Sequence, residues 1–190
     1  GDGHPVGHLG GAHVEHAKPA PDLLLLAARE LGVAPEACWY VGDSTWDYTG
    51  LSALADLGAL PFASASFDGC LNIVTLEHLT EPQRALIEMA RILKPGGKLL
   101  LAVPHEWEVH QAPHDYFRFT RYGVALLLER AGFVDLDIEP AGGYFRLLSR
   151  RLLNGLQFFP APLAPLAALF LAPPALLLPA LDFLDRDRIF

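Results

Sequence analysis

Cysteine is scarce in this 190-residue chain, which contains only Cys38 and Cys70. Each lies in an apolar, strand-like run and neither belongs to a paired motif, so the sequence offers no disulfide framework and no cysteine-based metal site. We interpret both as small buried hydrophobic residues of a protein in a reducing cytosol. This predicts a cytoplasmic protein.

Positive charge is also limited, because 14 Lys and Arg residues stand against 22 Asp and Glu residues, for a formal net charge of −8. No basic stripe is present that could release counterions from a phosphate backbone, so nucleic acid is excluded as a partner. The opening GDGHPVGHLGG has neither the basic nor the apolar region of a signal peptide. It does not begin with Met, which suggests a fragment or a processed chain.

The chain has 190 residues, of which 52% are hydrophobic. This is enough to form the buried core of one α/β domain. Short apolar runs alternate with amphipathic helical patterns, which implies parallel strands joined by right-handed crossovers. We therefore predict a Rossmann-like, mainly parallel sheet with helices on both faces, followed by apolar carboxyl-terminal helices. The expected strands are 38–42, 68–74, 98–103 and 134–139. One helix is expected after the Asp22 cap, and two more over 81–97 and 120–133. Composition divides the chain into zones 1–50, 51–145 and 146–190.

The middle zone contains motifs in a recognisable order: ALPF-x(4)-FD, LEH after a strand, a helix ending in EMARILKPGG, and another strand. The pattern continues through HQAPHDYFRFTRYGVALLLERAGF. Residues 56–133 resemble the carboxyl half of class I S-adenosylmethionine-dependent methyltransferases. The resemblance implies S-adenosylmethionine as cofactor and a small-molecule or lipid-like methyl acceptor.

By this resemblance, Asp56 and the Leu57 backbone contact the adenine ring, and Leu76 and Glu77 line the cofactor pocket. Alternatively, Asp56 caps a loop, Glu77 packs at a strand end and His78 caps the next helix. Catalytic candidates are Glu77, His78, His114 and Asp115.

A dense polar and aromatic cluster follows the 98–103 strand, and a histidine there suits a general base near neutral pH. The predicted substrate residues are His114, Asp115, Tyr116 and Arg118. Alternatively, Asp115 and Arg118 pair as a loop latch. His110 and His114 would share a metal only on a helix, which Pro113 disfavours.

Two family features are missing. No E/D-x-G-x-G-x-G run precedes Asp56, although such a loop normally approaches the methionine part of the cofactor at a helix N-terminus. The final antiparallel strand is expected only after residue 190. We therefore expect a fold that is incomplete relative to the family at both ends, with impaired methyl transfer. An inactive remnant that binds partners is the non-enzymatic alternative.

Residues 13–47, within the run AHVEHAKPAPDLLLLAARELGVAPEACWYVGDSTWD, resemble the carboxyl half of a haloacid dehalogenase-superfamily phosphatase core. The resemblance implies Lys18 as a phosphate ligand and Asp43 and Asp47 as Mg²⁺ ligands. The D-x-D-x-T/V nucleophile motif is absent, so we expect this zone to serve packing, with Mg²⁺-dependent phosphatase activity as the alternative function. The two resemblances predict a chimera joined near residues 48–54, by recombination, assembly error or engineering.

The last zone contains a charge-free run, 158–181, long enough to span a bilayer, which requires about 20 residues. Its six prolines are expected to break any single helix. We predict short helices that pack on the fold or lie peripherally at a membrane surface. Homo-oligomerisation through 146–184 is the alternative.

Overall fold

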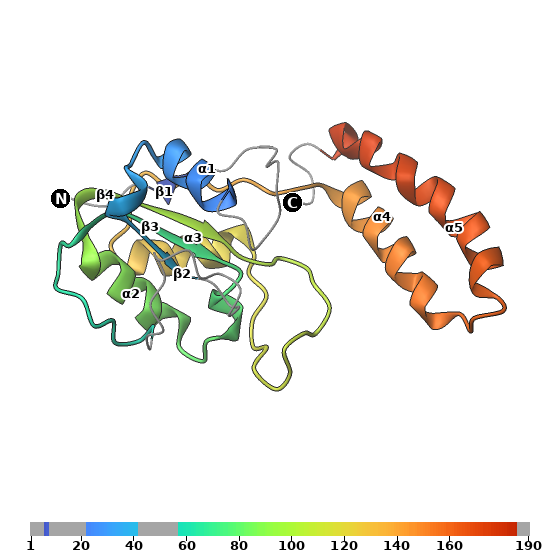
Figure 1. The fold of residues 1–190 in the computed structure, drawn as a ribbon, viewed down its shortest axis with the longest axis horizontal. Helices are drawn as coiled ribbons and strands as arrows, with labels where there is room; N and C mark the ends of the chain where they lie inside the picture. The colour runs from blue at the N-terminus through green and yellow to red at the C-terminus, as the bar shows by residue number, and fades with distance from the viewer. Residues whose placement is uncertain (1–5, 8–21, 42–56, 186–190) are drawn as a thin grey trace. The chain divides into compact units, whose positions relative to one another are not determined.

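The computed structural model describes residues 6–7, 22–41 and 57–185 (Figure 1). The chain forms two compact units, residues 1–139 and 140–190, and each is described by itself. The first unit contains the parallel sheet and the candidate site. The second consists of helices. The dividing point lies near the predicted boundary between residues 145 and 146.

The sheet of the first unit contains β1 (Val6–Gly7), β2 (Cys38–Val41), β3 (Phe67–Ile73) and β4 (Leu93–Ala102). Its order is β1-β4-β3-β2 and every neighbouring pair is parallel. The prediction of a mainly parallel sheet, with the 68–74 and 98–103 strands as parallel neighbours, is confirmed. All strands therefore end at the same edge of the sheet, where open α/β folds place their ligands.

Helices cover both faces of this sheet because successive strand residues point to opposite sides. On one face, α1 (Asp22–Leu31) packs its alanines and Leu31 against Leu71 and Leu100. On the other, α2 (Pro82–Ile92) and α3 (Arg121–Arg130) enclose Cys70 and Leu99 in a larger core. The Thr120 hydroxyl caps α3 by accepting a hydrogen bond from the Gly123 amide at 3.0 Å.

One predicted boundary and one predicted strand are wrong. Helix α2 ends at Ile92, so the Pro-Gly-Gly sequence expected to stop it lies inside β4. The strand takes up these residues through a register shift opposite Phe67 and Gly69, with Gly96 at a φ of 77°. Residues 134–139 form no strand, and Asp135 has a φ of 52°, which interrupts an extended course. Alternating polarity alone therefore predicted a strand that the backbone does not form.

The two zones assigned by sequence to different families share one sheet. Strand β2, from the first zone, pairs in parallel with β3 of the second zone from Cys38–Gly69 to Val41–Asn72. Helix α1 likewise packs on side chains of β3 and β4. The two zones therefore form one hydrogen-bonded sheet. A phosphatase fragment folded separately from the second zone would not predict this pairing.

The second unit is a helical hairpin of α4 (Tyr144–Gly155) and α5 (Ala164–Leu177), followed by the 3-10 helix η5 (Leu178–Leu184). Figure 1 shows α4 and α5 side by side, and the buried Ser149 hydroxyl of α4 donates to the Ala175 carbonyl at 2.6 Å. Two carboxylates after α5 accept hydrogen bonds from amides at the start of α4: Asp182 from Gly143 and Arg146, and Asp185 from Tyr144. Negative charge at the amino end of α4 is stabilised by the positive end of the helix dipole.

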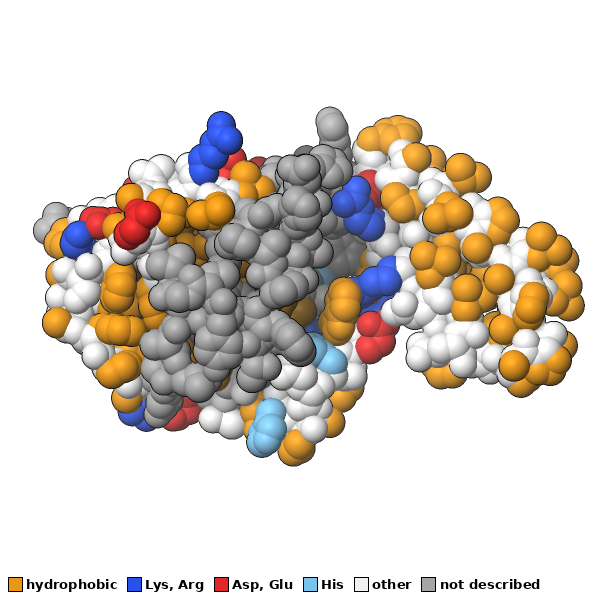
Figure 2. All heavy atoms as spheres, in the orientation of Figure 1, with side chains coloured by type: hydrophobic (Ala, Val, Ile, Leu, Met, Phe, Trp, Pro, Cys, Tyr) orange, Lys and Arg blue, Asp and Glu red, His pale blue; other side chains and the backbone are white. Residues whose placement is uncertain are grey.

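The expectation that proline breaks this apolar run is wrong in part, because α5 continues through Pro173 and Pro174. Residues 164–184 form one helical stretch of 21 residues, with mean hydropathy 1.9 and 11% of its most apolar window buried. Among the described residues it alone is long and apolar enough to cross a membrane. Figure 2 shows hydrophobic side chains spread over this unit.

An ion pair on α2 fixes the turn that leads from Leu57 into the sheet. Arg91 forms two hydrogen bonds of 2.8 Å with Glu88 and donates to the carbonyls of Leu60 and Phe62. The Glu88 carboxylate in turn accepts from the Leu60 amide at 2.9 Å. The hydrogen bonds from Arg91 hold the pKa of Glu88 below its ordinary value.

We expect Glu88→Gln to remove part of the acid dependence of stability. Because the folded-state pKa is lowered, the carboxylate stabilises the fold above about pH 4.5, and this contribution is lost as the pH falls through the lowered value. The difference in unfolding free energy between wild type and variant should therefore shrink as the pH falls below about 4.5. Urea unfolding across that range measures it. Glu81→Gln, at the N-cap position before α2 where the side chain is 71% exposed, is the matched control.

Candidate functional site

The site begins where β3 ends. Val74 has a φ of 46° and its amide donates to the Ala102 carbonyl, so the chain turns away from the sheet at this point. It continues directly into the 3-10 helix η3 (Leu76–His78). The side chain of Leu76 is fully buried in the core, and the Glu77 side chain is 1% exposed. A carboxylate is therefore held in the interior at the carboxyl edge of the sheet.

The loop that follows β4, residues 103–120, is fastened onto η3. The amides of Tyr116 and Phe117 both donate to the Glu77 carbonyl, at 2.9 and 3.3 Å. In return, Nδ1 of His78 donates to the His114 carbonyl at 2.7 Å. The Phe119 amide closes the base of the loop on the Pro104 carbonyl. Two segments 30 to 40 residues apart in the sequence thus form one polar surface.

An internal ion pair holds the shape of this loop. Asp115 forms two hydrogen bonds with Arg118, at 2.7 and 2.8 Å, and accepts a third from the His110 amide. The Arg118 guanidinium also donates to the carbonyls of Trp107 and Glu108. Hydrogen bonding by Arg118 holds the pKa of Asp115 well below its ordinary value. The latch that the sequence offered as the alternative to substrate binding is therefore present.

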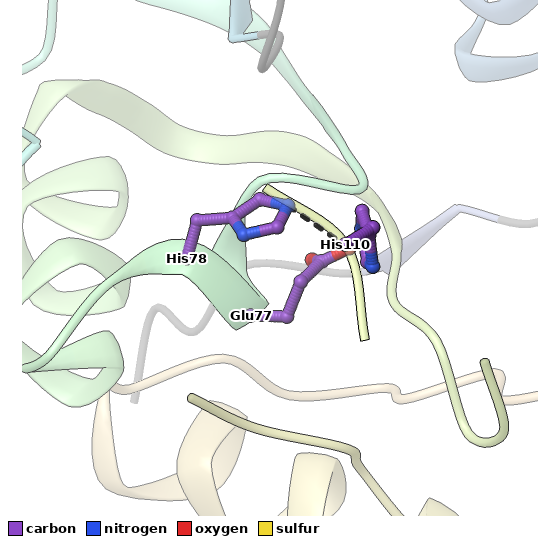
Figure 3. Close-up of side chains that lie close together, drawn as sticks. All are labelled: Glu77, His78 and His110. Carbon is purple, nitrogen blue, oxygen red and sulfur yellow. Dashed lines mark ion pairs between the residues drawn. The ribbon is translucent and has the colours of Figure 1, made fainter. Parts of the chain in front are cut away.

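The side chains of Glu77 and His78, from η3, lie close to that of His110 from the 103–120 loop (Figure 3). Nε2 of His78 lies 3.9 Å from Oε1 of Glu77, and Nε2 of His110 lies 4.0 Å from the same oxygen. The two imidazole rings are 4.8 Å apart and nearly perpendicular. From the sequence, His110 was considered as a metal ligand only together with His114. The structure pairs it instead with Glu77 and His78, which precede it by more than 30 residues.

His114 lies apart from these three side chains. Its Nδ1 is 3.0 Å from the hydroxyl of Tyr116, and both residues are exposed. This arrangement provides an accessible histidine–phenol pair on the loop surface, suited to proton exchange with a bound molecule.

Asn72 is a polar residue that the sequence reasoning did not single out. It lies in β3, one residue before the end of the strand, and is fully buried. Neither its amide nitrogen nor its oxygen has a hydrogen-bond partner among the residues that the structure describes. Such a group is costly unless something hydrogen-bonds to it. An asparagine within the otherwise apolar CLNIV run was the available sequence signal.

Four predicted site residues lie outside the described part of the chain: Lys18, Asp43, Asp47 and Asp56. Asp56 therefore remains a prediction. Leu57 is described, and its side chain belongs to the core. No finding supports Mg²⁺ binding or phosphatase activity.

Residues 12–101 match a family model that is described as a methyltransferase domain. This range contains most of the zone assigned by sequence to a haloacid dehalogenase-like fragment. The comparisons do not support that assignment, since one methyltransferase model spans residues on both sides of the proposed junction near 48–54.

Two curated relatives that this chain resembles are named as methyltransferases. The ubiquinone/menaquinone biosynthesis C-methyltransferase of Bordetella parapertussis is 36% identical over 99 residues, covering 50% of this chain and 36% of the relative. The demethylmenaquinone methyltransferase of Renibacterium salmoninarum is 51% identical over 47 residues, covering 25% of this chain and 20% of the relative. The chain thus spans about a third or less of the length of these relatives.

A solved structure, phosphoethanolamine N-methyltransferase 2 of Haemonchus contortus with phosphomonomethylethanolamine and S-adenosylhomocysteine, is 19% identical with a TM-score of 0.41. The match covers 68% of this chain and 32% of that one. Similarity at this level carries no argument about ligands. The family and relative matches nevertheless agree on similarity to methyltransferases. They support the resemblance predicted from residue 56 onward, and they extend it over residues 13–47, which the sequence had assigned to another family.

Proposed function

We propose that this chain takes part in methyl transfer from S-adenosylmethionine to a small or lipid-like acceptor. The observation that carries the proposal is the docking of the 103–120 loop onto η3 through the Glu77 carbonyl. This docking gathers polar and aromatic side chains at the carboxyl edge of β3 and β4, where ligands of open parallel sheets bind.

The described residues fit a cofactor at this edge. Asn72 offers a buried amide whose oxygen and nitrogen lack partners, one residue before the end of β3. Glu77 adds a buried carboxylate five residues later. When bound, S-adenosylmethionine supplies a methyl group already activated on a sulfonium, so the protein's task is to position donor and acceptor and to move a proton where needed.

The loop provides the acceptor side of the proposed site. Trp107, Tyr116 and Phe117 expose between 37% and 50% of their surface, which suits an aromatic or lipid-like molecule. His114, hydrogen-bonded to the Tyr116 hydroxyl, is the proposed proton acceptor. Asp115 and Arg118 bind each other, so we assign them to positioning of the loop rather than to contact with the acceptor.

We further propose that the chain alone binds the cofactor weakly, because no Gly-rich E/D-x-G-x-G-x-G run precedes Asp56. In related folds such a run lets backbone amides approach the ligand. Weak binding would make methyl transfer slow.

Isothermal titration calorimetry with S-adenosylhomocysteine tests the proposal. We expect saturable binding, with a dissociation constant on the order of micromolar to hundreds of micromolar. Asp56→Ala should weaken it at least about tenfold, equivalent to about 1.4 kcal/mol. Asp68→Ala is the matched control, because Asp68 lies at the amino end of β3, opposite the proposed site. Absence of binding at millimolar ligand, or equal weakening by both variants, would contradict the proposal and favour an inactive binding module.

A further inference from the structure

We propose that Glu77, His78 and His110 form a binding site for a divalent transition-metal ion. One potential ligand atom from each residue lies within 4.8 Å of the other two. Glu77 and His78 come from η3 and His110 from the docked 103–120 loop (Figure 3). The inference rests on these donor atoms alone and does not depend on the proposed methyl transfer.

The hydrogen bonds of both histidines direct the remaining nitrogen of each ring toward Glu77. Nδ1 of His78 lies 2.7 Å from the His114 carbonyl, and Nδ1 of His110 lies 3.1 Å from the Glu108 carbonyl. A carbonyl oxygen only accepts, so each Nδ1 carries the hydrogen and each neutral ring presents the lone pair of Nε2. Pinning one imidazole nitrogen to a carbonyl in this way is the usual support of a metal-binding histidine.

The distances from the two Nε2 atoms to Oε1 of Glu77 are too long for hydrogen bonds and closer to those between two ligands of one metal ion. Distances of 3.9 and 4.0 Å from the two Nε2 atoms to Oε1 of Glu77 exceed the 2.7–3.2 Å range of hydrogen bonds. Two ligand atoms of a tetrahedral ion with bonds of about 2.0–2.2 Å lie about 3.4 Å apart, so the two rings need to move only about half an ångström toward Glu77 to share an ion. Within the part of the chain that the structure describes, the buried Nε2 of His78 has no hydrogen-bond partner, and the His78 side chain is 9% exposed. It is thus an unsatisfied lone pair directed into the cluster.

Charge and access favour a cation at this point. The Glu77 side chain is 1% exposed, and its carboxylate, which also interacts electrostatically with Arg118, supplies negative charge to a cation bound by the two histidines. His110 is 29% exposed and provides the open side through which an ion and water can enter. Three protein ligands leave a further coordination position for water or another small molecule.

The donor set selects the class of metal. Two imidazole nitrogens and one carboxylate oxygen suit Zn²⁺, Co²⁺, Fe²⁺ or Ni²⁺, whereas Mg²⁺ and Ca²⁺ prefer oxygen ligands alone. Four further histidines, at positions 4, 8, 13 and 16, could compete for the same metals. The test therefore uses a full-length background chain in which these four are replaced by asparagine.

The experiment is a titration of this chelator-treated background chain with Co²⁺, followed by visible absorption, and with Zn²⁺ as competitor. We expect one equivalent of Co²⁺ with absorption bands typical of four or five ligands, displaced by Zn²⁺. His110→Ala, a change in a partly exposed loop residue, should weaken binding more than about tenfold. His114→Ala should leave binding unchanged, since its ring lies outside the cluster.

His78→Ala and Glu77→Gln should act like His110→Ala, with circular dichroism confirming that each variant is folded. Failure of the background chain to bind Co²⁺ or Zn²⁺ would overturn the proposal. Equal binding by the background chain and its His110→Ala variant would overturn it as well. Neither result bears on S-adenosylhomocysteine binding, so this proposal and the proposed function can fail separately.

Discussion

In detergent-free buffer the full chain is expected to self-associate, and a mild detergent or lipid vesicles should disperse it. The reason lies in α5 and η5, where Leu169, Phe170, Leu176 and Phe183 each expose more than 60% of their surface. Burying one such side chain fully contributes about 1.5–3 kcal/mol. Several together form a patch of the kind that soluble monomers rarely expose.

Sedimentation velocity with and without dodecyl maltoside measures this effect. The double substitution Leu169→Glu with Phe170→Glu should shift the chain toward monomer and abolish vesicle flotation. Ala161→Glu, an exposed change in the turn before α5, is the control and should leave association unchanged. A monodisperse wild-type monomer that does not bind vesicles would contradict this prediction, and with it the proposed membrane or self-association role of residues 146–184.

Leu86→Ala is expected to cost about 2–5 kcal/mol of unfolding free energy, which is the range for a large-to-small change in a packed core. Leu86 is fully buried on α2, in the cluster that also contains Leu76 of η3 and Leu99 of β4. The loss is a large part of the 5–15 kcal/mol available to a typical domain. Because the same cluster supports η3, the Glu77 and His78 side chains should lose their fixed positions together with stability.

Ile87→Ala provides the matched control, because Ile87 is the next residue of the same helix and is 48% exposed. Its effect should stay within about 0.5 kcal/mol. Urea denaturation of both variants, followed by tryptophan fluorescence, gives the two free energies. Similar losses in both, or no loss in Leu86→Ala, would show that α2 does not pack on the sheet as described.

The sequence predicted the three main strands and the helices around them because their signals are local. The run KLLLAVP is too apolar for an exposed strand, and Thr120 before an amphipathic segment marks a helix start. It failed at 134–139, where alternation suggested a strand although Asp135 adopts a positive φ. It also failed at Pro173 and Pro174, where the helix continues.

The candidate site was predicted only in part. The LEH motif and the loop residues His114, Asp115 and Arg118 follow apolar strands, so their place at the carboxyl edge was accessible from the sequence. The approach of His110 to Glu77 and His78 was not, because it depends on the tertiary docking of the loop through backbone hydrogen bonds. No local pattern encodes such a contact between segments more than 30 residues apart.

The central claim is that S-adenosylmethionine binds at the carboxyl edge of β3 and β4. Ultraviolet cross-linking of the radiolabelled cofactor to the full chain, followed by peptide mapping, tests it most directly. We predict label in peptides covering residues 57–78 or 103–120, lost on competition with excess S-adenosylhomocysteine. Label confined to α1, to residues 140–190, or insensitive to the competitor would contradict the claim.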